Sequence, residues 1–412
     1  MFFEDVPKGP ADPVYILKNA VDADNSPRKI DLGVGVYRNE QAEYHELQAI
    51  REAKKILTQK ELGHDYEVTT GDAEFVKNAA NLLFGRDAGA VQSRRVTSVQ
   101  AISGTGSIHL AALFLSRCAS FQGKKVYIGT PAWGNYEPLF SLVGLEVAKY
   151  KYYDADKGIV DFPSVLHAVS QAPEGSIFAL QGCCHNPSGL DLTPSQWRDL
   201  AQAMKKRKQF PLFDMAYQGL GAPLEEDAYG LRYFEQLGFE LLACQSFSKN
   251  FGLYGERCGV LHAISSSEKV AANVYDQLRC LIRWEFSSSP AYGARLVNTI
   301  LASEVLSGKW TAELATMRQR LAELRRALHS ALVEKRNVSS LLMVPNSILI
   351  FPDTGQLEHN PLFNRAFLLP ASEHSTMLDI GDQAPHPHVA KWAHQCVRPE
   401  LIESRTNSIC HR

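Results

Sequence analysis

The chain has 412 residues, with 43 Lys and Arg against 45 Asp and Glu, so its formal net charge is −2. This balance excludes the broad basic surface that nucleic acid or anionic membrane requires, and we expect neither partner. The sequence contains no run of about 18 uncharged apolar residues, which excludes an ordinary membrane-spanning helix. The length predicts two or three domains, or one large core with an attached lobe.

The N-terminus and the cysteines bear on the compartment. Residues 1–10 include Glu4 and Asp5 but no apolar segment, so we expect neither a secretory signal nor an Arg-rich transit peptide. The eight cysteines form no Cys-x-x-Cys pair, and we predict free thiols in a reducing environment. The predicted location is therefore cytoplasmic.

Short apolar runs alternate with helical windows through the middle of the chain. We predict strands at 96–102, 125–129, 177–181, 210–213, 241–247 and 259–264. We predict helices at 108–116 and 194–206, the second with Thr193 as its N-cap and Pro194 in its first position. This alternation is typical of an α/β fold, a largely parallel sheet with helices on both faces. Ligands of such sheets bind at the carboxyl ends of the strands.

A long amphipathic helix is predicted at 311–337. Its apolar positions step by three and four residues, as core or domain-packing surfaces do. They are Leu314, Met317, Leu321, Leu324, Leu328 and Leu332. After residue 338 the composition changes, because the last 74 residues hold six of the 13 His and seven of the 20 Pro and show little periodicity.

The segment Ser103-Gly104-Thr105-Gly106-Ser107 lies between a predicted strand and a predicted helix. Glycines at such a place let backbone N–H groups approach an anion, and a helix N-terminus favours negative charge. The segment matches neither the Walker loop nor Gly-x-Gly-x-x-Gly. It predicts either an anion cradle or a plain strand-to-helix turn.

Three polar side chains follow other predicted strands. Asp214 ends an apolar run and could neutralise a protonated ring nitrogen or cap a helix. Lys249 also ends a run, and burial near Arg257 would favour its neutral amine, which can form a Schiff base; the alternative is a surface lysine. Asn186 could donate to a phenolate oxygen or hold a turn. Together these groups match what pyridoxal phosphate requires of a protein.

The chain resembles the aspartate aminotransferase branch of the fold-type I pyridoxal-phosphate enzymes. The resemblance covers about residues 1–338, and its segments occur in the family's order. They are residues 32–38, 103–106, 131–135, 185–189, 214–219, 246–250 and 253–257, and Arg283 with 290–295. The resemblance implies an α/β fold with a mostly parallel seven-stranded sheet between helices, in a large cofactor-binding domain at 46–310. Residues 1–45 and the C-terminal segment would build a small α/β domain, with 311–338 as the helix leading into it and 339–412 as an atypical segment.

The resemblance also implies roles. Lys249, Asp214 and Tyr217 would be catalytic, and pyridoxal 5′-phosphate would be the cofactor. Residues that would hold the cofactor are Ser103, Gly104, Thr105, Trp133, Asn186, Asp214, Tyr217, Ser246, Lys249, Arg257 and, from a neighbouring subunit, Tyr66. Gly35, Trp133, Asn186 and Arg283 would bind the substrate. Arg283 would reach across a homodimer to the substrate's side-chain carboxylate.

The implied reaction is transamination between L-aspartate and 2-oxoglutarate, so small amino acids and 2-oxo acids are the expected partners. Two alternatives remain open. One is a broader enzyme that also accepts aromatic amino acids. The other is a chain that binds the cofactor but is catalytically impaired, because the family's arginine for the α-carboxylate has no clear counterpart here.

The resemblance stops abruptly near residue 338. The nearest remnant of the missing arginine motif is Arg405 in Ser404-Arg405-Thr406-Asn407. The tail is either an altered reading frame or splice product or a replaced segment, and we predict that it is poorly ordered. His386, His388, His394 and Cys396 are all possible zinc ligands, but they match no standard spacing, so a His-rich surface is expected and no metal is predicted.

Overall fold

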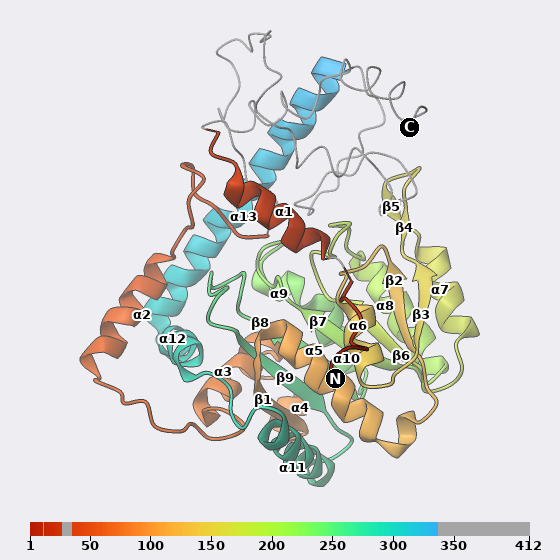
Figure 1. Ribbon diagram of the computed structural model, residues 1–412. Coiled ribbons are helices and arrows are strands. Elements are labelled where there is room, and N and C mark those ends of the chain that lie inside the picture. The colour runs from red at the N-terminus through yellow and green to blue at the C-terminus, as the bar shows by residue number, and fades with distance from the viewer. Residues whose placement is uncertain (11, 27–34, 337–412) are drawn as a thin grey trace.

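A seven-stranded sheet forms the centre of the computed structural model (Figure 1). The structure describes residues 1–10, 12–26 and 35–336. In spatial order the strands are β1 (Val96–Ile102), β9 (Cys258–Ile264), β8 (Leu241–Ser246), β7 (Phe210–Met215), β6 (Ile177–Gln181), β2 (Val126–Thr130) and β3 (Val147–Lys151). Strand β9 pairs antiparallel with both of its neighbours, whereas the other neighbouring pairs are parallel. A separate ribbon joins β4 (Tyr153–Asp154) and β5 (Ile159–Val160). The predicted mostly parallel sheet is confirmed.

The strand predictions hold closely. Strands β1 and β6 match the predicted residues, and the ends of β2, β7, β8 and β9 differ by one or two residues. Strand β3 was not predicted, because this edge strand has a Lys at two of its five positions and no fully buried residue. Helix α8 matches in full, with Thr193 and Gln196 forming a reciprocal capping box.

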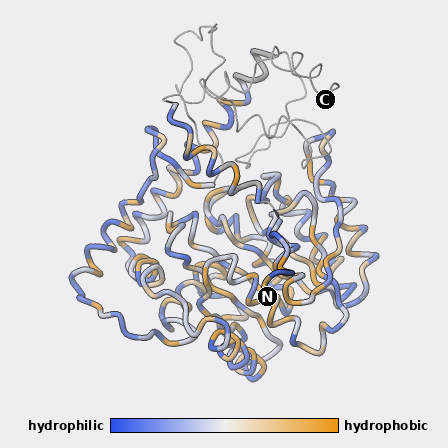
Figure 2. Tube along the Cα trace, in the orientation of Figure 1, coloured by the Kyte–Doolittle hydropathy of each residue, from blue (hydrophilic) through white to orange (hydrophobic). Residues whose placement is uncertain are grey.

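Helices cover both faces of the sheet (Figure 1). Described helices and bounds are α1 (Pro13–Ala23), α2 (Gln48–Gln59), α3 (Ala73–Phe84), α4 (Gly89–Gln92), α5 (Ser103–Arg117), α6 (Tyr136–Leu142), α7 (Phe162–Gln171), α8 (Pro194–Lys206), α9 (Leu224–Asp227), α10 (Tyr229–Gln236), α11 (Glu268–Glu285), α12 (Ala291–Leu301) and α13 (Glu304–Arg336), with a 3-10 turn at Ala119–Phe121. Figure 2 shows hydrophobic residues concentrated along the central strands and hydrophilic residues on the outer helix α2.

Alternation along the strands assigns each side chain to a face. In β7, Leu212 packs with residues of α5, α6 and α11, while Phe213 packs with residues of α7, α8 and α10. Successive strand side chains point to opposite faces, so Asp214 lies on the same face as Leu212. This places the Asp214 carboxylate toward α5 and α6, at the carboxyl end of the strand.

Helix α13 begins at Glu304, seven residues before the predicted start. The reason is a local cap, because the Ser303 hydroxyl accepts the Leu306 N–H at 3.3 Å. Leu314 and Met317 are buried in a third cluster with residues of α2 and α12, as the apolar stripe predicted. Leu321, Leu324 and Leu328 are only half-buried.

Within the part of the chain that the structure describes, no helix combines the length and the apolar character needed to cross a membrane.

Candidate active site

Four strands bring the predicted site residues to one edge of the sheet. Strand β1 runs in the same direction as β8, because both pair antiparallel with β9. The carboxyl ends of β1, β6, β7 and β8 therefore lie along the same edge. Ser103 follows β1, Asn186 lies five residues after β6, Asp214 is the penultimate residue of β7, and Lys249 lies three residues after β8.

A hydroxyl cluster marks the start of α5. The Ser103 hydroxyl lies 2.8 Å from the Ser248 hydroxyl and 3.3 Å from the Ser246 hydroxyl. Arg257 donates to the Ser248 hydroxyl at 3.4 Å. Backbone N–H groups of a helix start, three hydroxyls and a guanidinium thus converge, as an anion site requires.

The turn into α5 is tighter than expected. The prediction of a helix starting at Ile108 was wrong, because α5 begins at Ser103, directly after β1. Ser103 has a φ of 61°, so one residue in the left-handed region makes the whole turn. Gly104 and Thr105 therefore lie in the first helical turn, where N–H groups lack helical partners.

Two glycines permit this close approach. A Cβ on Gly259 would lie 2.6 Å from the carbonyl carbon of Ser103, so no other residue fits there without a shift of the backbone. A Cβ on Gly104 would lie 3.1 Å from the Ser246 Cβ. The cradle thus requires glycine at 259, and a side chain at 104 would press against Ser246.

Asp214 is buried beside Tyr136, the first residue of α6. The Tyr136 hydroxyl donates to Asp214 Oδ2 at 2.6 Å, and Oδ1 has no hydrogen-bond partner among the described residues. Burial raises the pKa of the Asp214 carboxyl, while the Tyr136 hydrogen bond and the charge of Lys249 oppose this rise. The carboxylate thus retains capacity for a further donor.

Lys249 lies over the ring of Tyr217, with Nζ 4.9 Å from the ring centroid. Burial lowers the pKa of the Lys249 amine; Arg257 lowers it further, and Asp214 opposes the change. A neutral amine is the form that acts as a nucleophile or as a base. The effects of burial and of Arg257 on the pKa of Lys249 have the direction that the sequence predicted.

The side chains of Asn186 and Tyr217 form a hydrogen bond with each other. The backbone of Asn186 is held by Gln181, whose side chain accepts its N–H at 2.7 Å and donates to its carbonyl at 2.9 Å. Burial raises the pKa of the Tyr217 hydroxyl, so the hydroxyl stays protonated and can donate. The structure thus joins Asn186, Tyr217, Lys249 and Asp214 in one group.

Trp133 is half-buried and packs edge-on against Tyr136, with ring centroids 5.4 Å apart. Tyr136 was missed at the sequence level, because the matched segment ends at Asn135 and a tyrosine at a helix start reads as core. The available signal was its position directly after that segment.

A model of the family described as aminotransferase class I and II matches residues 27–364. The chain belongs to this family. It is 49% identical over 302 residues to aminotransferase tasG of Hapsidospora irregularis, covering 73% of this chain and 80% of that protein. It is 41% identical over 323 residues to the aspartate aminotransferase of Haemophilus influenzae, covering 78% and 81%. The predicted resemblance to aspartate aminotransferases is confirmed.

Solved structures agree with this assignment. The aspartate aminotransferase from the cytoplasm of Saccharomyces cerevisiae superposes with a TM-score of 0.80 at 35% identity, covering 84% of this chain and 85% of the other. The aromatic-amino-acid aminotransferase of Burkholderia pseudomallei, covalently bound to pyridoxal phosphate, gives 0.78 at 38% identity, covering 81% and 83%. The fold is that of the fold-type I aminotransferases, and the chain is an enzyme of the transferase class.

Three predicted residues of this aminotransferase do not join the group around Lys249. Tyr66 is 92% exposed. Arg283 is exposed on α11 and bonds the Ser287 hydroxyl, and Gly35 is exposed near the N-terminus. The predictions for residues 32–34 and for the tail, including Arg405, the possible zinc ligands His386, His388, His394 and Cys396 and the expected poor order, lie outside the described residues.

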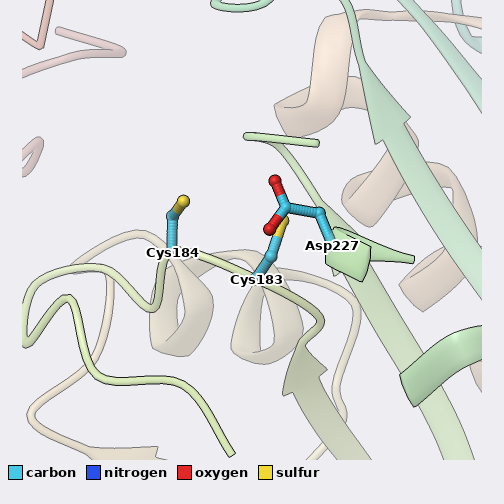
Figure 3. A group of neighbouring side chains, drawn as sticks. All are labelled: Cys183, Cys184 and Asp227. Atoms are coloured by element: carbon cyan, nitrogen blue, oxygen red, sulfur yellow. The ribbon is translucent and has the colours of Figure 1, made fainter. Parts of the chain in front are cut away.

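Cys183, Cys184 and Asp227 form a second polar group (Figure 3). The ligand atoms of Cys183, Cys184 and Asp227 lie within 4.8 Å of one another, and Figure 3 shows the Cys183 sulfur beside the Asp227 carboxylate. That carboxylate accepts three backbone N–H groups, from Gly219 at 2.7 Å, Gly221 at 3.2 Å and Ala222 at 2.9 Å.

The chemistry of this group favours a structural role. Burial raises the pKa of Asp227 to about 7. The hydrogen bond to Cys184 and burial raise the pKa of the Cys183 thiol, so the thiol is protonated in the metal-free group. Cys183 and Cys184 are free thiols, as predicted. We interpret Asp227 as the anchor of the loop at 219–222.

Proposed function

We propose that this aminotransferase binds pyridoxal 5′-phosphate and transfers the amino group of L-aspartate to 2-oxoglutarate, giving oxaloacetate and L-glutamate. The observation that carries the proposal is the pairing of a buried lysine with a buried aspartate at the strand ends. Burial shifts the pKa of both Lys249 and Asp214 toward the neutral form, and the electrostatic attraction between the two groups opposes both shifts, which favours the charged Asp214 that the proposal needs. Shifts of opposite sign in two neighbouring buried groups are typical of catalytic residues.

The residues present fit the proposed cofactor. Asp214 Oδ1 accepts no hydrogen bond from the described residues, and a protonated ring nitrogen is a suitable donor. The cluster of Ser103, Ser246, Ser248 and Arg257 can hold a phosphate with the N–H groups of Gly104 and Thr105. When bound, the cofactor supplies a conjugated ring that withdraws electrons from the substrate's α-carbon.

The remaining work falls to side chains of this chain. The neutral Lys249 amine would move a proton between the substrate's α-carbon and the C4′ atom of the cofactor. Asp214 would keep the ring nitrogen protonated by its negative charge. Tyr217 and Asn186 would donate to the ring's hydroxyl oxygen, and Trp133 would stack on the ring face.

Substrate binding and assembly follow from the resemblance to the family. We propose a homodimer in which Arg283 binds the distal carboxylate and Tyr66 reaches the phosphate of the neighbouring site. The exposure of both side chains supports action across subunits. Gly35 would lie in a segment that closes over the substrate, within a small domain built from residues 1–45 and the C-terminal segment. We also propose a cytoplasmic location, although named relatives include cytoplasmic, mitochondrial and chloroplastic enzymes.

A second candidate is a broader activity on aromatic amino acids. It is favoured by the aromatic-amino-acid aminotransferase of Burkholderia pseudomallei and by the broad-specificity aminotransferase of Leishmania mexicana, which has a TM-score of 0.80 at 32% identity.

Visible absorbance of the purified protein with pyridoxal phosphate tests the proposal. We expect a bound-cofactor band that L-aspartate converts to the amine form of the cofactor. A similar conversion with L-tyrosine or L-phenylalanine would support the broader activity. A stable band that ignores every amino acid would favour the impaired alternative, and the absence of any band would overturn cofactor binding.

A further inference from the structure

Tyr136 touches two residues of the proposed cofactor site. Its hydroxyl donates to Asp214 Oδ2 at 2.6 Å, a distance typical of a hydroxyl bonded to a charged carboxylate. Its ring lies edge-on to Trp133, with centroids 5.4 Å apart. Tyr136 itself is only 2% exposed, so the surrounding core fixes its position.

The hydrogen bond holds a group that has few other donors. Asp214 extends from β7 on the face that α5 and α6 cover, and Oδ1 has no partner among the described residues. A buried carboxylate with a single hydrogen bond tends to become protonated, and a neutral carboxyl cannot stabilise a protonated ring. The Tyr136 hydrogen bond, together with the charge of Lys249, favours the charged form.

The donor cannot readily exchange roles with Asp214. Burial and the neighbouring carboxylate raise the pKa of the Tyr136 hydroxyl well above its usual value. The hydroxyl therefore remains a donor throughout the working pH range. The hydrogen bond to Oδ2 also limits rotation of the Asp214 carboxylate and so fixes its orientation.

We propose that Tyr136 is a positioning residue, whose hydroxyl keeps Asp214 ionised and fixed in orientation so that its remaining acceptor capacity serves the ring nitrogen of the cofactor. This inference rests on the proposed function for its purpose, but the effect on Asp214 exists without cofactor. Tyr136 acts through Asp214 and, by its ring, supports Trp133.

The variant Tyr136→Phe separates these two contributions, because it keeps the ring against Trp133 and removes only the hydroxyl. Tyr152→Phe is the matched control. Tyr152 is also buried, and its hydroxyl donates to the Leu190 carbonyl at 2.8 Å instead of to Asp214. Both variants lose one buried phenol hydrogen bond, so a general loss of stability affects both.

Two measurements test the inference. In cofactor-free protein, infrared absorption of the protonated carboxyl, assigned by its loss in Asp214→Asn, reports the ionisation of Asp214. We expect Tyr136→Phe to move this ionisation to higher pH and Tyr152→Phe to leave it unchanged. In the second, titration with pyridoxal phosphate should give a dissociation constant at least about ten-fold weaker for Tyr136→Phe alone, as for a lost hydrogen bond to a charged group.

The outcomes are separable. Unchanged Asp214 ionisation in Tyr136→Phe overturns the inference, whatever the affinity. A shift in ionisation without any change in cofactor affinity overturns the role toward the cofactor. If the parent protein binds no pyridoxal phosphate, the proposed function fails, and the infrared measurement still decides whether Tyr136 holds Asp214 ionised.

Discussion

Asp214 and Asp227 are both buried carboxylates, and burial raises the pKa of both, yet their surroundings differ. Asp227 accepts three backbone N–H groups from residues five to eight positions away. Asp214 accepts one hydroxyl, from a residue 78 positions away, and keeps an oxygen without a partner among the described residues. Burial alone therefore does not mark a functional carboxylate. The number of donors it has already used separates the loop anchor from the site residue.

The substitution with the largest expected effect tests the role of Asp214 in the site. Asp214→Asn keeps an oxygen for the Tyr136 hydroxyl but removes the charge that the ring nitrogen would need. We expect turnover with L-aspartate to fall by about 30-fold to several thousand-fold, as when a buried charge pair loses one partner. Steady-state kinetics give the effect on turnover. Cofactor-free stability should hold or rise, because burial disfavours the charged form of this carboxylate and Asn still accepts the Tyr136 hydrogen bond. A clear loss of stability would make Asp214 resemble Asp227.

The substitution Asp227→Asn tests the role of Asp227 as the anchor of the loop at 219–222. The amide NH2 would face backbone N–H donors, so at least one bond is lost and a donor is left unsatisfied. We expect the free energy of unfolding at mildly acidic pH to fall by about 1–3 kcal/mol, as measured by urea denaturation. Glu226→Gln is the control, because Glu226 is exposed in the same helix and should change little. Equal effects of the two substitutions would remove the anchoring role.

The pH dependence of stability sharpens the same contrast. The pKa of Asp227 is about 7 in the folded protein, against an ordinary value of 3.8. Between these values the folded chain binds a proton that the unfolded chain releases, so stability falls as pH rises, by about 1.4 kcal/mol per unit. Asp227→Asn lacks this contribution, so its deficit relative to the parent should shrink from acidic to neutral pH. Any contribution of Asp214 is present in both proteins and cancels. A deficit independent of pH would contradict this.

The smallest effect concerns metal ions. Since Asp227 is occupied by three N–H groups and the Cys183 thiol is held protonated, we expect neither zinc nor a chelator to change the melting temperature. A zinc-dependent rise that Cys184→Ala abolishes would show that the group binds metal, and would move Asp227 to the functional side of the comparison.

The sequence alone predicted those residues of the site that follow apolar strands. Asp214 and Lys249 are conspicuous because each ends such a run, and the alternation of runs and helical windows predicted the sheet. The sequence did not predict the roles of Tyr136 and Asp227. A tyrosine that starts a helix reads as core, and an aspartate after Glu225 and Glu226 reads as part of a solvated acidic run. Their roles depend on contacts between segments that no local pattern contains. The early start of α5 depends on the φ of one serine, which composition does not reveal.

The direct passage from β1 into α5 at Ser103 also constrains how this chain can change in length. One residue inserted there would rotate the helix by about 100° and carry the N–H groups of Gly104 and Thr105 away from Ser246 and Ser248. One residue removed would do the same in the opposite sense. The turn at 155–158, between β4 and β5, holds none of the proposed site residues. Insertions and deletions in descendants of this gene should therefore accumulate in such outer segments and be purged at the junction.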